Sequence, residues 1–383
     1  MLMELSWRPD DHGGMSGTGG PGSRGAAGRR RWAWAVPVGT AVVVAGAAVA
    51  FNVDVAGAAS LPAVGSSELV QRVLESSTRA FSGTVVTTAD LGVPALPGVA
   101  DSASLSPLAF LTGRHTSQVW VDGPDRQRVA VTAQLSEADV VHSGDDVWTY
   151  SSEANAYSHQ TLPTGAGDGH AAPEVPADLP RTPQAAAQQL LAALDPTTTV
   201  TVSDDQRVAG RDAYTLVLRP RTPDTTVREV TIAVDGATSV PLAVAVRGAA
   251  ASPALSIAMT QVDFATPPAS RFAFTPPAGA TRTDDPFGAA GLPHADHAAP
   301  SAATGLGRPT VTGTGWAAVV SVPGAGAGLD ASKGVLSQLT TSLPGGARLL
   351  HTALINAVVT ADGRLVAGAV PVEAVERAAG VTP

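Results

Sequence analysis

Short segments of alternating hydrophobic and polar residues dominate the chain between residues 140 and 274. Successive side chains of a strand point to opposite faces of a sheet, so residues two apart share a face. Four segments have this spacing, at 140–162, 208–220, 227–246 and 255–264. Asp235-Gly236 lies between two apolar runs and is a hairpin signal. The pattern predicts an antiparallel sheet with one consistently apolar face.

The apolar face of this sheet is the candidate binding surface. A sheet that curves can enclose a cavity, and the scarce large aromatic residues are natural parts of its lining. The alternative, that such residues are ordinary core, stays open. The apolar phase of the last segment slips between Met259 and Val262, which predicts a bulge. The candidate lining residues are Trp120, Trp148, Tyr150, Tyr214, Leu216, Leu218, Val230, Ile232, Val234, Leu242, Val244, Val246, Leu255, Ile257 and Met259.

Two helices are predicted beside the sheet. The first covers residues 66–81, with Ser66 or Ser67 as its cap. Its apolar stripe consists of Leu69, Val70, Val73, Leu74 and Ala80. The second covers residues 183–194, because Thr182 followed by Pro183 is a helix-start signal.

The N-terminal region predicts a membrane segment. Residues 1–31 lack periodicity and are expected to form a disordered cytoplasmic tail. Residues 32–53 carry no charge and follow three arginines, which is typical of a single transmembrane anchor within residues 32–55. A signal peptide cleaved near Ala56 is the alternative, and the protein would then be secreted. Either reading places the bulk of the chain outside the cytoplasm.

Length and composition limit the remaining organisation. A chain of 383 residues predicts two folded units. We expect the first at residues 60–277, a Pro/Ala/Gly-rich linker at 278–310, and a small α+β unit at 311–383. The absence of cysteine excludes disulfides and thiolate metal sites, and a net charge of −9 argues against nucleic acid as a partner.

No residue pattern predicts an enzyme, a metal site or a cofactor. His294 and His297 lie in the linker without a third ligand, and Gly324, Gly326 and Gly328 depart from the dinucleotide fingerprint. The acidic pairs at 145–146, 204–205 and 284–285 are expected at turns. The isolated histidines are expected to face solvent; they are His115, His142, His159 and His351.

Five motifs then occur in a fixed order. They are V-x-x-G-D-D-V-W-x-Y at 141–150, G-R-x-A-Y-x-L-x-L-x-P at 210–220, V-D-x-x-T-x-x-P-L at 234–242, T-x-V-x-F at 260–264 and F-x-F-x-P-P at 272–277. Together with the first helix, they make residues 66–277 resemble the superfamily of the lipoprotein carrier LolA and the sigma-factor regulator RseB.

This resemblance implies a mainly β fold with helices, a curved, unclosed antiparallel barrel whose apolar face is covered by the two helices as a lid. It also implies that the partner is a lipid or a lipoprotein acyl chain. The additional C-terminal unit looks more like the regulator branch, for which the partner is a membrane anti-sigma factor. A membrane-tethered binding protein is therefore the leading interpretation, and a regulator that acts through another membrane protein is the alternative.

Overall fold

The computed structural model describes residues 61–76, 78–93, 112–133, 135–162, 182–192, 197–284, 286–287, 308–326 and 334–381. The predicted cytoplasmic tail and membrane segment lie outside these residues. Within the described part of the chain, no helix is both long and apolar enough to cross a membrane.

The first unit is one large mixed sheet of twelve strands. Their order across the sheet is β12-β6-β5-β4-β3-β2-β1-β11-β10-β9-β8-β7, and every neighbouring pair is antiparallel except β12 with β6. The strands are β1 (Ala80–Asp90), β2 (Thr112–Asp122), β3 (Arg126–Thr132), β4 (Glu137–Ser143), β5 (Asp146–Ser151), β6 (Ala156–Thr161), β7 (Thr198–Val208), β8 (Arg211–Pro220), β9 (Glu229–Asp235), β10 (Pro241–Arg247), β11 (Leu255–Asp263) and β12 (Thr281–Arg282).

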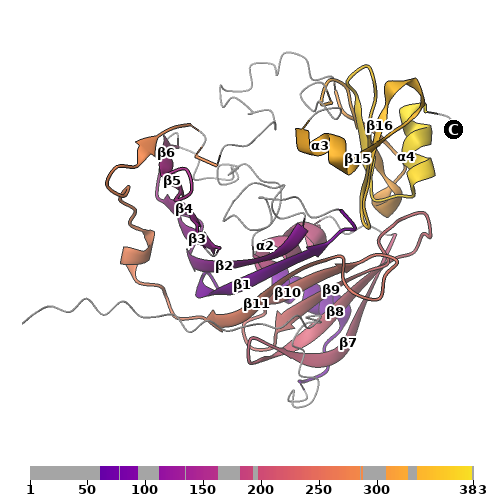
Figure 1. The fold of residues 1–383 in the computed structure, drawn as a ribbon. Helices are drawn as coiled ribbons and strands as arrows, with labels where there is room; N and C mark the ends of the chain where they lie inside the picture. Colours follow the sequence, from indigo (N-terminus) through magenta and orange to yellow (C-terminus); the bar gives the residue numbers. More distant parts are fainter. Residues whose placement is uncertain are drawn as a thin grey trace, which may run out of the picture. The chain divides into compact units, whose positions relative to one another are not determined.

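The sheet is curved and unclosed, as the sequence predicted (Figure 1). We call the face that carries Leu216, Ile232 and Val244 the inner face, and the face that carries Trp120 and Trp148 the outer face. Helix α2 (Pro183–Ala192) contacts β10 and β11, and α1 (Ser66–Leu74) contacts α2 and β7. The contacts of the described helices therefore concentrate at one end of the sheet and do not extend as a lid across it.

The helix limits differ from the prediction at one end. Helix α1 ends at Leu74 and Ala80 already belongs to β1, because Ser76 and its hydroxylated neighbours favour non-helical backbone. The residue at the N-cap is Gly65, without a side-chain cap. The predicted start of α2 is confirmed, since the amide of Ala185 donates to the Thr182 hydroxyl at 3.1 Å.

Two irregularities shape the sheet. The predicted bulge lies where β1 pairs with β11, between Thr84 and Val85. At this place β11 approaches so closely that a Cβ on Gly83 would lie 2.3 Å from the Gln261 carbonyl oxygen. A second bulge interrupts β7 between Ser203 and Gln206. Asp205 thus lies within an edge strand and not at the predicted turn, and its carboxylate accepts the Leu61 amide at 2.8 Å.

An ion pair between β8 and the end of β9 joins three of the five motifs. Asp235 is 1% exposed and accepts both Nε and Nη2 of Arg211. The same carboxylate accepts the amide of Thr238 at 2.7 Å and its hydroxyl at 2.8 Å, which closes the predicted turn before β10. The Arg211 guanidinium lies 4.8 Å from the ring centroid of Phe264, and the Thr238 carbonyl accepts Ser76 Oγ after α1.

The C-terminal unit is a six-stranded antiparallel sheet in the order β13-β14-β18-β17-β16-β15. Helix α4 (Val372–Ala379) begins after Pro371, and its Val375 packs in the core of this unit. Residues 349–360 form a hairpin, at whose turn the Thr352 hydroxyl accepts the amide of Ile355. The remaining elements are β13 (Thr310–Thr312), β14 (Val319–Val322), α3 (Gly334–Leu339), β15 (Thr340–Ser342), β16 (Arg348–His351), β17 (Asn356–Val359) and β18 (Leu365–Gly368).

Backbone and side-chain hydrogen bonds join this unit to the large sheet. The Thr225 hydroxyl donates to the Ala369 carbonyl at 2.6 Å, and the Ala353 amide donates to the Leu91 carbonyl at 2.8 Å. Leu354, on the turn between β16 and β17, is buried in the core of the first unit. The chain between the two sheets stays with the first unit as far as β12, which pairs with β6.

We expect Asp235→Asn to lower the free energy of unfolding by about 3 kcal/mol, because it leaves Arg211 without its buried counter-charge. Asp212→Asn is the matched control. Its pair with Arg207 is substantially exposed, so a loss below about 1 kcal/mol is expected. Urea denaturation measures both, and equal losses would show that the Arg211 pair has no special weight.

The same variant predicts a pH dependence. Burial opposes ionisation of Asp235, but Arg211 and Thr238 outweigh it and hold its pKa below the ordinary value. The carboxylate therefore stabilises the fold fully above about pH 4, the unfolded-state pKa, and this contribution is lost as the pH falls further. The stability difference between wild type and Asp235→Asn should shrink below that pH.

Candidate functional site

The register of the sheet divides the predicted lining residues between its two faces. Directly paired residues of neighbouring strands point to the same face. Leu216 pairs with Ile232, which pairs with Val244, and this row lies on the inner face. Trp120 pairs with Arg128, which pairs with Val141, which pairs with Trp148, and that row lies on the outer face. Trp120, Trp148 and Tyr150 therefore do not share a surface with the other twelve.

On the inner face of β8 to β11, the predicted lining is a packed core. Leu216 and Ile232 are both 0% exposed, and α1 and α2 contribute Leu69, Val73 and Leu191 to the same cluster. Of the predicted lid residues, Val70 is partly buried and Leu74 is 49% exposed. The predicted lining residues buried in this core are Tyr214, Leu216, Leu218, Val230, Ile232, Val234, Leu242, Val244, Ile257 and Met259, with Val246 and Leu255 partly buried beside it.

On the outer face, the aromatic residues are half-buried beneath a segment that returns from β11. We call residues 269–283 the crossing segment. Arg271 and Arg128 lie over the Trp120 ring, with guanidinium carbons 5.2 and 5.6 Å from its centroid. Phe274 contacts Trp148 and Tyr150, with ring centroids 5.6 and 6.1 Å apart.

The crossing segment explains the F-x-F-x-P-P motif, whose role the sequence alone did not reveal. Its short helix Ala269–Phe272 contacts β3 and β4, and Phe272 is buried. It ends as β12, which adds a parallel strand to the edge of β6. Figure 1 shows this segment running outside the curve of the sheet. Its two phenylalanines cover the outer face, so the aromatic residues there are a structural contact.

The inner face of β2 to β6 has a different character. Its buried residues form a separate cluster of Val131, Ala138, Val140 and Val147. Val129, Ala133, Leu162 and Phe287 pack against this cluster, and α1 and α2 contribute no residue to it. Neighbouring positions on the same face are small and hydroxylated, including Ser117, Thr149 and Ser158. The Thr149 and Ser158 hydroxyls are 2.6 Å apart and bond to each other. This half of the inner face, which we call the small-residue trough, combines apolar walls with hydroxyl groups.

Two histidines expected in solvent are buried on the inner face. His115 is 5% exposed and its Nε2 lies 2.9 Å from the Thr112 carbonyl oxygen. His142 is 9% exposed and pairs across the strands with Gln127 and Val147. The prediction was wrong because both residues fall on the buried phase of their strands. The period-two pattern could have revealed this for His142, which lies two residues after Val140.

The carboxylates of Asp139 and Asp146 on the outer face pair with neighbouring side chains of the same sheet. Asp139 is buried and accepts Arg128 Nε and Nη2 at 3.0 and 2.8 Å. Partial burial and the neighbouring Asp139 raise the pKa of Glu137. His159 stacks on Trp148 with centroids 3.8 Å apart and contacts Asp146 at 2.7 Å. Within the described residues no three His, Asp or Glu side chains gather as a metal site, and His294 and His297 lie outside them.

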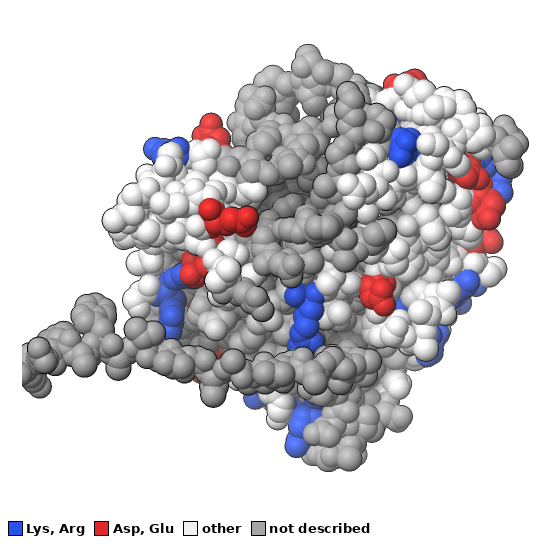
Figure 2. Space-filling model, viewed as in Figure 1, with Lys and Arg blue, Asp and Glu red and all other residues white. Residues whose placement is uncertain are grey.

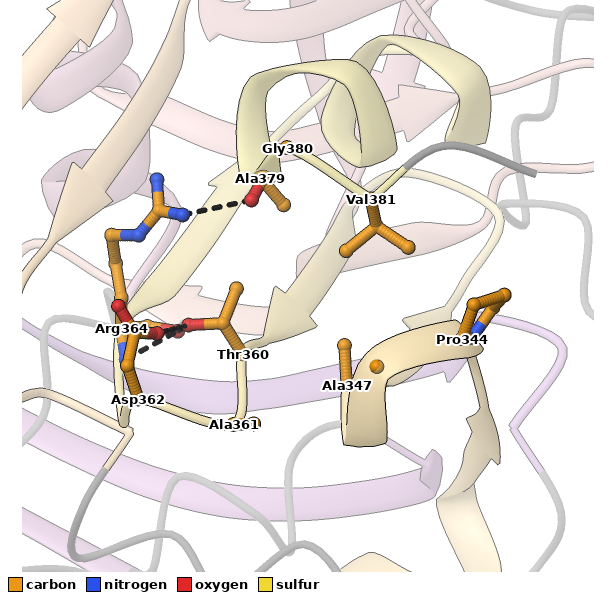
Figure 3. A pocket seen from close by; sticks show the side chains of 10 residues that line it. Pro344, Ala347, Thr360, Ala361, Asp362, Arg364, Ala379, Gly380 and Val381 are labelled. Atoms are coloured by element: carbon orange, nitrogen blue, oxygen red, sulfur yellow. Dashed lines mark hydrogen bonds between the residues drawn. The ribbon is translucent and has the colours of Figure 1, made fainter.

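The charges seen in Figure 2 and one pocket of the C-terminal unit lie among other residues than the predicted lining. The described acidic and basic side chains on the face seen in Figure 2 are scattered and form no patch of one sign. A shallow pocket of about 450 Å³ lies in the C-terminal unit and contains Thr360, Asp362 and Arg364 (Figure 3). Arg364 is already engaged, since its Nη2 donates to the Ala379 carbonyl at 2.8 Å. None of the predicted lining residues lies in this pocket.

Comparison with protein families matches residues 104–284 to a family described as "Predicted periplasmic protein (DUF2092)". The match begins before β2 and ends after β12, and therefore includes the small-residue trough and the crossing segment. The comparison with curated proteins finds no match.

The solved structures that this chain matches include MucB. The complex of MucA and MucB from Pseudomonas aeruginosa matches at 17% identity and a TM-score of 0.42, over 82% of this chain and 96% of that one. A LolA superfamily protein from Nitrosomonas europaea matches at 12% identity and a TM-score of 0.23, over 55% of this chain and 99% of that one. The resemblance to the LolA and RseB superfamily is thus found again among the matches.

A putative outer membrane lipoprotein-sorting protein domain from Vibrio parahaemolyticus also matches, at 9% identity and a TM-score of 0.20, over 51% of this chain and 90% of that one. With identities under 25% and TM-scores under 0.5, these structures do not indicate a ligand for this chain. Any proposal about its ligand rests on its own geometry.

We expect Ile232→Arg to lower the free energy of unfolding by about 3–5 kcal/mol, because the charge would enter a core that α1 and α2 already fill. Val320→Arg, at a 39% exposed strand position of the C-terminal sheet, is the control and should change it by less than about 0.5 kcal/mol. Thermal and urea unfolding measure both. A folded, stable Ile232→Arg protein would instead indicate open space at this position.

Proposed function

We propose that this protein is an extracytoplasmic binding protein that holds an apolar ligand, of the acyl-chain class, on the inner face of β2 to β6. The observation that carries the proposal is the small-residue trough. Small side chains leave more room above a sheet than Leu, Ile and Met, and ligand sites are concave, mostly apolar surfaces with few polar groups. The described helices contribute nothing to its apolar cluster.

The trough replaces the predicted lining at β8 to β11 as the ligand surface. That region is packed by α1 and α2, so a ligand there would have to displace a formed core. In the trough, the buried valines supply apolar contact and the hydroxyls of Thr149 and Ser158 are paired with each other. Paired hydroxyls do not compete for the ligand, which favours an acyl chain over a polar ligand.

No enzymatic role is part of this proposal. A catalytic site needs a nucleophile, base or metal set held within hydrogen-bond reach of one another. Among the described residues, the polar contacts of the sheet are ion pairs and caps that hold strands and turns, as at Arg128–Asp139 and Arg211–Asp235. Binding without chemistry is the function that this arrangement supports.

The alternative is a regulator whose partner is a membrane protein, as an RseB-like protein would act through a membrane anti-sigma factor. The observation that favours it is an apolar pair on the C-terminal sheet. Val311 and Val320 face each other across β13 and β14 and are 62% and 39% exposed. Exposed apolar strand residues are suited to a protein contact. MucB, which this chain matches, was solved in complex with another protein, MucA.

We expect Thr149→Trp to weaken binding of a pyrene-labelled dodecanoic acid at least tenfold, because the indole would fill the trough. Gln118→Trp is the control, since Gln118 is exposed on the outer face of β2 and should leave binding unchanged. Fluorescence titration gives the affinities and circular dichroism checks the fold. A wild-type protein that binds no acyl probe would favour the regulator, and equal binding by both variants would move the ligand away from the trough.

The proposed location is the outer side of the cytoplasmic membrane, with residues 32–53 retained as the anchor. The family that matches residues 104–284 is described as periplasmic, which supports the extracytoplasmic part of this proposal. We expect the mature protein to fractionate with membranes and to keep its N-terminus. N-terminal sequencing that starts near residue 59 would replace the anchor by a cleaved signal peptide.

A further inference from the structure

The Nε2 of His142 is a buried nitrogen atom without a partner. It accepts or donates no hydrogen bond. The two residues paired with His142 give it none, because Val147 is apolar and the Gln127 amide donates to the Pro124 carbonyl at 3.2 Å. The buried His115 on the same face has such a partner in the Thr112 carbonyl. Of these two buried histidines, His142 is therefore the one whose Nε2 lacks a partner.

An unsatisfied buried ring nitrogen is costly. Most buried polar groups of folded proteins are hydrogen-bonded, and an exception calls for an explanation, because a buried nitrogen that has lost water and gained no partner destabilises the fold. A leucine of similar volume at this position would avoid that cost. The retained imidazole is explained if a ligand atom completes its hydrogen bond.

The position of His142 relates it to the trough. It lies on the inner face of β4, two residues from Val140, and in the same cross-strand row as Phe81, Val121, Gln127, Val147 and Gln160. This row follows the one that contains Val119, Val129, Val140, Thr149 and Ser158. His142 is thus next to the apolar cluster, toward the β4–β5 turn. Gln127 and Val147 flank it in the row, and Gln160 lies one strand further.

We propose that His142 is the head-group site of the trough, and that its Nε2 donates a hydrogen bond to the carboxylate or ester carbonyl of an acyl ligand whose chain lies over Val140 and Val131. This inference rests on the proposed function and narrows it. The ligand is an amphiphile with an oxygen acceptor at one end, not a plain hydrocarbon surface. A free fatty acid and an esterified acyl chain share this chemistry.

The experiment compares three probes with the same chain and different ends: a pyrene-labelled dodecanoic acid, its methyl ester, and pyrenyl dodecane. Wild type should bind the acid or the ester about tenfold more tightly than the hydrocarbon, the usual effect of one good hydrogen bond. Tight binding of the acid alone identifies a free carboxylate as the ligand group, and tight binding of both identifies an acyl carbonyl.

In His142→Leu the three probes should bind alike, with the affinity that wild type has for the hydrocarbon. The ligand-free variant should melt at a higher temperature than wild type, because the unpartnered nitrogen is gone. His142→Gln keeps an amide donor and should retain part of the preference. His115→Leu is the matched control, which should keep the full preference and melt at a lower temperature.

Four outcomes would overturn the inference, and they differ in what they leave standing. Equal binding of the three probes by wild type, or an undiminished preference in His142→Leu, would remove His142 from the site and leave the acyl-binding trough intact. Failure of wild type to bind any of the three would remove the proposed function and this inference together. A lower melting temperature for His142→Leu would show that the imidazole is part of the packing.

Discussion

The ion pair between Arg211 and Asp235 is the interaction on which the rest of the sheet depends. It joins β8 to the end of β9, closes the turn into β10, and supports Phe264 at the end of β11. Ser76 connects the end of α1 to the same turn. Three of the five sequence motifs meet here, so these motifs reflect a structural requirement. Their presence relates to the shape of the sheet and does not identify a ligand.

The two halves of the inner face differ in the residues that pack on them, and the proposed binding surface lies on only one of them. Large aliphatic residues on β8 to β11 pack on α1 and α2 and form the main core, as Leu216 and Ile232 show. Small residues on β2 to β6 form a second cluster whose described members lie apart from those helices. A protein that binds by one end of a sheet can keep the other end rigid, so that a ligand meets a surface whose curvature is already fixed.

Period-two alternation was sufficient to predict β8 to β11, their turn at Asp235, and the bulge in β11. The alternation did not predict features that depend on the pairing between strands. The face of Trp148 follows from its register with Val141, which a single strand does not contain. The hairpin at 349–360 likewise depends on a turn held by the side chain of Thr352, which an alternation pattern does not reveal. The missing hydrogen bond of His142 is visible only in the structure. That His142 lies on the buried face could be predicted, because it follows Val140 by two residues.

The bulge in β7 affects how the edge of this sheet can pair with another chain. β7 is the last strand of the sheet, and a straight strand of eleven residues there would present a long row of unpaired backbone groups to any other chain. The bulge between Ser203 and Gln206 breaks that row, and the Asp205 carboxylate within it binds the Leu61 amide of the same chain. The opposite edge is shortened by β12. Both features limit edge-to-edge pairing of this open sheet with another chain.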